Sequence, residues 1–147
     1  MLLNQIQSGD VILTRNDSDN PSPGYWNHAS LYVGNYKIVE AQVKPNKVIL
    51  SDLSEFWNRY PEIVVLRIKP VHITSATSIV IDARKIVGSP YRKIASLFRF
   101  LRRGHRGENC VSVIRKSFIK TLGYDPGWKI PDDIMNDDIF WTVGEKE

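Results

Sequence analysis

Over roughly the first half of the chain, apolar residues fall in short runs separated by turn-forming residues. The runs have the length of strands in globular proteins, about four to eight residues. Proline, glycine, asparagine and aspartate favour turns and loops, and they gather at residues 16–24 and 34–35. The pattern predicts strands at residues 11–15, 28–33, 37–42, 47–50 and 62–69. The short turn between 28–33 and 37–42 predicts that these two strands form a hairpin.

From residue 75 onward the apolar residues recur every three or four positions, which is the period of an amphipathic helix. This period predicts helices at residues 75–87, 91–103 and 110–122. Shorter signals predict helical turns at 51–57 and 131–134 and a last strand at 139–143. We therefore expect an α+β fold in which helices pack on an antiparallel sheet, as a single domain over residues 1–147.

Composition narrows the function classes. The 147 residues carry a net charge of +4, an excess too small to indicate a specific nucleic-acid partner. One cysteine excludes an internal disulfide, and the three histidines are too far apart for metal-ligand spacing, so we expect no metal and no other cofactor. No apolar run approaches the roughly 20 residues of a membrane span. The first residues show no signal-peptide pattern, so a cytoplasmic location is expected.

Cys110, the single cysteine, precedes the apolar stripe of the helix predicted at 110–122. A thiol at a helix N-terminus is stabilised as thiolate, the nucleophilic form, by the helix dipole and by unpaired backbone N–H groups. The same N–H groups could bind an oxyanion during acyl transfer. The alternative is a buried structural cysteine that packs as a small hydrophobe.

A nucleophilic thiol needs a base, and the chain offers His28, His72 and His105. His72 follows a strand end, and His105 lies among arginines that disfavour its protonated form. His28 opens a predicted strand directly after a proline- and glycine-containing loop. Strand alternation places it on one face with Ser30 and Tyr32. His28 is therefore the candidate base, and a structural histidine is the alternative.

Glu40 lies inside the otherwise apolar predicted strand 37–42, where a carboxylate is costly without a partner. In the predicted hairpin, the register that a turn at Asn35 sets brings Glu40 close to His28 on the neighbouring strand. A carboxylate there could orient the imidazole and stabilise its protonated form. An ion pair between Glu40 and a surface lysine or arginine is the alternative.

The order of these segments resembles a known family. The chain contains, in sequence, GDVILTR, HASLYVG, IVEA, VILSDLSEFW, GSPY and a helix opening with a cysteine. This order is similar to that of the circularly permuted NlpC-type papain-like cysteine hydrolases, the YiiX/YebB-like amidases. The resemblance implies a permuted papain-like fold: a small barrel-like antiparallel sheet packed against helices, with the nucleophile at a helix N-terminus.

The resemblance also implies the chemistry. Cys110 becomes the nucleophile, His28 the general base and Glu40 the residue that orients it, while Tyr91 becomes a candidate wall of the substrate pocket. The implied reaction cleaves an amide, as in a peptidase or an amidase of cell-wall-type peptides, through a thioester on Cys110. The backbone N–H of Cys110 is expected to be one oxyanion donor.

A basic segment supplies a second possibility. Residues 84–106 hold eight of the 20 lysines and arginines and no acidic residue, and Arg99, Arg102 and Arg103 lie beside the apolar stripe of the predicted helix 91–103. Such a helix either exposes a solvated face or contacts an anionic surface. The second alternative favours lipid acyl hydrolysis or acyl transfer at a membrane. A catalytically silent binding module of the same fold is the third hypothesis.

Overall fold

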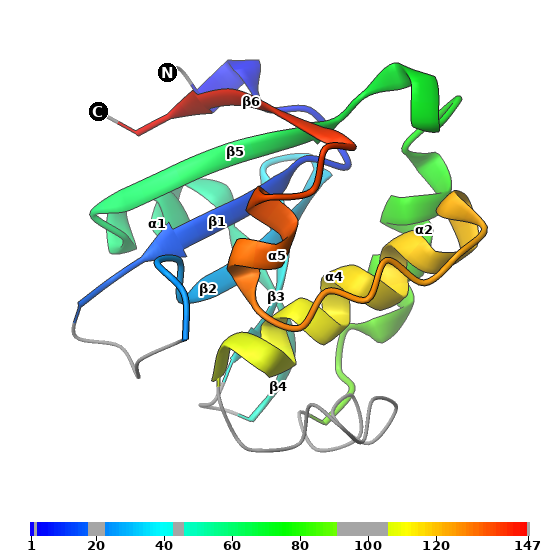
Figure 1. Ribbon diagram of the computed structural model, residues 1–147. Helices are drawn as coiled ribbons and strands as arrows, with labels where there is room; N and C mark the ends of the chain where they lie inside the picture. The colour runs from blue at the N-terminus through cyan, green and yellow to red at the C-terminus, as the bar shows by residue number, and fades with distance from the viewer. Residues whose placement is uncertain (2, 18–22, 43–45, 91–105, 147) are drawn as a thin grey trace.

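The described residues of the protein fold around an antiparallel sheet of six strands in the order β4-β3-β2-β1-β5-β6 (Figure 1). The computed structural model describes residues 1, 3–17, 23–42, 46–90 and 106–146. The strands are β1 (Val11–Arg15), β2 (His28–Gly34), β3 (Lys37–Gln42), β4 (Lys47–Asp52), β5 (Glu62–Ile68) and β6 (Phe140–Glu145). All strand pairs are antiparallel, so the expected α+β class and sheet type are confirmed.

Helices cover both faces of the sheet. Figure 1 shows α4 and α5 in front of the sheet and α1 behind it. The α4 face buries the larger apolar cluster, and α2 packs beside α4 on that face. The elements are α1 (Leu53–Arg59), α2 (Thr77–Ile86), α4 (Arg106–Leu122), α5 (Pro131–Met135) and the 3-10 turns η1 (Leu3–Gln5) and η2 (Pro70–His72).

Alternation along the strands divides the core into two layers. Val11 and Leu13 of β1 pack on the α4 side, whereas Ile12 between them packs against the residues of α1. Successive strand side chains point to opposite faces, and here each face meets helices. Apolar residues on both faces are therefore buried, which explains why β1 and β5 read as continuous apolar runs.

The β2–β3 hairpin has the register that matters for the site. Asn35 and Tyr36 at its turn have φ angles of 52° and 59°, as a two-residue hairpin turn with both central residues left-handed requires. Leu31 pairs with Val39, and Tyr32 pairs with Ile38. The β2–β3 pairing is irregular next to the turn, where Gly34 pairs with Lys37.

The structure corrects two expectations of detail. In the described part of the chain the edge strands β4 and β6 do not pair with each other, so the sheet is open rather than a closed barrel. The helix expected to open at Cys110 begins four residues earlier, at Arg106. The helix predicted at 91–103 lies outside the described residues. No helix among the described residues has the length and apolarity to cross a membrane.

Candidate thiol–imidazole site

His28 and Glu40 form a buried contact on the α1 face of the sheet. Nε2 of His28 lies 2.9 Å from Oε1 of Glu40, and both side chains are fully excluded from solvent. Continuing the hairpin register beyond Leu31 and Val39 places Glu40 opposite Ser30, so His28 is its diagonal neighbour on the same face. The sequence predicted that these side chains meet, and the structure brings them together.

Neighbouring strands and helix α1 hold the Glu40 carboxylate in place. The hydroxyl of Ser51 on β4 donates to Oε2, and Nη1 of Arg59 lies 3.4 Å from the same oxygen. The side-chain amide of Gln42 donates to Oε1. Burial alone would raise the pKa of Glu40, but hydrogen bonding and charge from His28, with Ser51 and Arg59, outweigh it and lower that pKa to about 2. Glu40 is therefore an anion at any physiological pH.

Aromatic rings of helix α1 and the residue after it enclose the imidazole. The ring of Tyr60 stacks on His28 with centroids 5.7 Å apart and planes at 20°, and the Phe56 ring lies 6.2 Å away. Burial lowers the pKa of His28, but Tyr60, Cys110 and Glu40 raise it by a larger amount, so that the pKa stands well above its usual value. This environment therefore favours the imidazolium, the form needed beside a thiolate.

Cys110 reaches this site from the opposite layer. Its side chain is fully buried within the apolar cluster under α4, and its sulfur accepts a hydrogen bond from the backbone N–H of Ala29 at 3.3 Å. The N–H of Tyr32 points to the β1 side, where it donates to Asp10. Because backbone direction alternates along a strand, the N–H of Ala29 points to the β3 side.

The end of the β2–β3 pairing makes room for the sulfur. Paired residues between these strands begin at Leu31 and Val39, so the N–H of Ala29 lies beyond the ladder and donates to sulfur instead. The sulfur thus lies beside His28, and its proximity contributes to raising the pKa of the imidazole. Nδ1 of His28, the ring nitrogen not bonded to Glu40, makes no hydrogen bond among the described residues and is left available for a proton. The three candidate residues are thus gathered in one place.

The position of Cys110 within α4 changes one expectation. A helix that begins at Arg106 has Cys110 as its fifth residue, so the helix's own hydrogen-bond ladder uses the Cys110 N–H. The prediction that this N–H serves as an oxyanion donor is therefore wrong for this geometry. The backbone donor that does reach the sulfur comes from β2.

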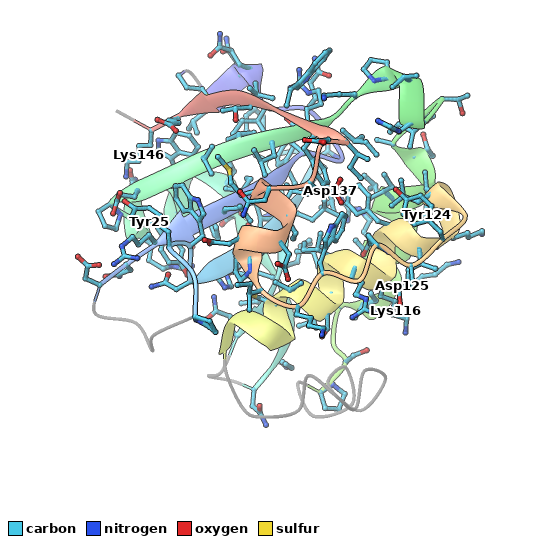
Figure 2. All side chains as sticks on the ribbon, viewed as in Figure 1. Tyr25, Lys116, Tyr124, Asp125, Asp137 and Lys146 are labelled. Carbon is cyan, nitrogen blue, oxygen red and sulfur yellow. The ribbon has the colours of Figure 1, made fainter. Side chains whose placement is uncertain are left out.

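The chain before His28 is fixed from a distant part of the sequence. Asp132 of α5 accepts hydrogen bonds from the backbone N–H groups of Tyr25 and Trp26, at 2.9 and 2.8 Å. A Cβ on Gly24 would come within 2.4 Å of the Asp132 carboxyl carbon, so this close approach requires glycine. Figure 2 shows Tyr25 at the end of the sheet where Lys146 also lies, and the two residues line one hollow.

Sequence reasoning missed Ser51, Arg59 and Tyr60. Ser51 lies near the end of a strand, and Arg59 and Tyr60 lie at the C-terminus of a helix. Nothing in the local sequence shows that these side chains face Glu40 or His28. The predicted pocket residue Tyr91 and the basic residues Arg99, Arg102 and Arg103 lie outside the described residues.

The described residues do not fit a metal centre. Among them, no group of three or more His, Cys, Asp or Glu side chains is arranged to hold an ion. Cys110 is bonded to the backbone N–H of Ala29, and Nε2 of His28 is bonded to Glu40.

Comparison with known proteins identifies the fold but no family. No family model matches the chain, and no curated protein matches its sequence. Among solved structures, the fold is similar to that of the metalloprotein YiiX from Escherichia coli O157:H7, with a TM-score of 0.73 and 16% identity over 97% of this chain and 98% of that chain. At this identity the likeness concerns the fold, and it agrees with the YiiX-like arrangement that the order of sequence segments implied.

Proposed function

We propose that the protein is a thiol-dependent hydrolase that cleaves an amide bond through Cys110, His28 and Glu40. The observation that carries the proposal is the buried imidazole with a carboxylate on Nε2 and, beside it, the Cys110 sulfur, which accepts a hydrogen bond from the backbone N–H of the next residue, Ala29. A carboxylate and an imidazole without solvent contact need partners, and here each is the partner of the other. Side chains in these relations form the nucleophile, base and orienting acid of acyl-transfer enzymes.

The geometry supports a covalent mechanism. Nδ1 of His28 takes the proton of the Cys110 thiol, and Glu40 stabilises the resulting imidazolium through Nε2. The N–H of Ala29 stabilises the thiolate by its hydrogen bond to sulfur. The thiolate attacks the amide carbonyl, the imidazolium protonates the departing amine, and a thioester on Cys110 remains. His28 then takes a proton from water, which attacks the thioester and releases the acid.

A direct test uses the fact that the chain has one cysteine. We expect iodoacetamide to alkylate Cys110 faster than a model thiol at pH 6, and His28→Gln to remove most of that advantage. His72→Gln is the matched control, because this histidine is exposed on η2. Alkylation at the rate of a model thiol, unchanged in His28→Gln, would contradict the proposal.

The substrate class is tested separately. A panel of peptide amides, including cell-wall-type peptides, and phospholipid vesicles distinguishes an amidase from a lipid acyl hydrolase or acyltransferase. Peptide turnover lost in Cys110→Ser supports the amidase. Acyl release from phospholipid that falls in an Arg99, Arg102 and Arg103 to Glu variant supports the lipid alternative. A biological effect that survives Cys110→Ser supports a binding module instead.

A further inference from the structure

Arg59, the last residue of α1, contacts the Glu40 carboxylate with a permanent positive charge, in addition to the His28 imidazole. Its Nη1 lies 3.4 Å from Oε2 of Glu40, an oxygen that also accepts the Ser51 hydroxyl. The guanidinium carbon lies 5.6 Å from the centre of the Tyr60 ring and 5.8 Å from that of Phe56. The same two rings pack against the imidazole of His28.

The side chain of Arg59 is exposed to solvent, unlike the side chains of Glu40 and His28. Its side chain is 39% exposed, whereas the Glu40 and His28 side chains have no solvent contact. The charge of Arg59 is therefore exposed to solvent and its ions, while the guanidinium contacts the buried Glu40 carboxylate. Glu40 in turn contacts His28, the proposed base. Aromatic faces favour a cation, so Tyr60 and Phe56 help to hold the guanidinium over this contact.

We infer that Arg59 is a positioning residue of the thiol–imidazole pair and that its solvent-facing charge makes the working pH range of the pair depend on ionic strength. The inference rests on the proposed hydrolase function, because it concerns how the base of that reaction is held.

The sign follows from counting charge around the pair. The charged and titratable groups that contact its members are Glu40 from β3, Arg59 and Tyr60 from α1 and the residue after it, and Cys110 from α4, facing His28 on β2. Arg59 is a permanent positive charge in this set. Removing it makes every loss of a proton from the cluster less favourable. The pH at which Cys110 becomes reactive therefore moves upward.

The size of the effect follows from distance and solvent. The Arg59 charge lies a few ångströms from Glu40, farther from the thiol, and is partly solvated. Its loss should therefore displace the pH midpoint of Cys110 reactivity by on the order of 0.5 pH unit. The Debye length falls from roughly 30 Å at 0.01 M salt to roughly 3 Å at 1 M. Salt should therefore screen the exposed guanidinium and move the wild-type profile in the same direction as loss of Arg59.

The experiment measures the rate of iodoacetamide alkylation of Cys110 from pH 4 to 10, at low and at high salt. We expect the midpoint of Arg59→Gln to lie about 0.5 pH unit above that of the wild type at low salt. Arg59→Lys should keep most of the wild-type midpoint, because it retains the charge. Lys85→Gln, which removes one exposed charge from α2, controls for the change in net charge. High salt should raise the wild-type midpoint and leave that of Arg59→Gln nearly unchanged.

Two results would overturn the inference. One is an Arg59→Gln variant that reacts more slowly at every pH without displacement of the midpoint, since that is the effect of a merely structural residue. The other is an equal displacement in Lys85→Gln. Failure of the proposed function has a different signature, namely wild-type alkylation no faster than that of a model thiol and unaffected by His28→Gln.

Discussion

The Glu40 carboxylate allows a quantitative prediction that does not depend on knowing the substrate. Its pKa is lowered from 4.5 to about 2, mainly by His28 with Ser51 and Arg59 against the opposing effect of burial. At about 1.4 kcal/mol per unit of pKa, the folded state gains about 3 kcal/mol at pH 7 from having this group ionised rather than neutral. Glu40→Gln keeps the shape of the side chain and removes the charge. We therefore expect the free energy of unfolding to fall by about 3 kcal/mol at pH 7.

The pH dependence gives the prediction its sign. A carboxylate with a lowered folded-state pKa stabilises the protein above pH 4.5, and that stabilisation is lost as the pH falls toward 2. By pH 3 the difference between the wild type and Glu40→Gln should therefore shrink to about half of its value at pH 7 or less.

Urea unfolding at pH 7 and pH 3, followed by circular dichroism, measures both differences. Glu55→Gln is the control, because this carboxylate lies exposed on α1. Equal stabilities of wild type and Glu40→Gln at pH 7 would refute the reasoning, since the charged contact would then contribute nothing. A difference that stays constant between pH 7 and pH 3 would also refute it, because the loss would then be one of shape rather than charge.

Three further substitutions test other contacts. Gly24→Ala should weaken folding by about 1–3 kcal/mol and slow catalysis, because its Cβ would meet Asp132 at 2.4 Å; unchanged urea midpoint and activity would contradict this. Thr14→Val should raise the free energy of unfolding by about 1 kcal/mol, because the buried Thr14 hydroxyl has no hydrogen-bond partner among the described residues; a loss of stability would count against it. Arg115→Lys should lower thermal stability by about 1–3 kcal/mol, because both oxygens of Asp125 accept from the Arg115 guanidinium at 2.6 Å; an unchanged melting temperature would contradict that role.

Local periodicity predicted most of the described elements well. The predicted strands 11–15 and 37–42 have the boundaries of β1 and β3, and the remaining predicted strands and the helices at 75–87 and 131–134 differ from the structure by a few residues at their ends. Such patterns depend on neighbours two to four positions apart, which the sequence displays directly. The helix predicted to start at residue 110 begins at Arg106 in the structure. Residues 106–109 are the first residues of α4, but they carry no apolar side chains that the periodic pattern could detect.

The hairpin explains why two of the candidate site residues could be brought together without a structure. A two-residue turn fixes the register of its strands, so the proximity of His28 and Glu40 follows from a short stretch of sequence. The surroundings of that pair could not be found in this way. Ser51, Arg59 and Tyr60 belong to segments that meet the hairpin only when β4 pairs with β3 and α1 packs on the sheet.

By itself, the sequence determined the α+β class, the positions of the strands along the chain, and the approach of His28 to Glu40. Only the tertiary structure decided that Cys110 comes from the opposite layer to the edge of the β2–β3 pairing, where the Ala29 N–H meets its sulfur. The physical reason is the range of the interactions involved. Repeating patterns and tight turns are set by adjacent residues, whereas a contact between a late helix and an early strand depends on how whole layers pack.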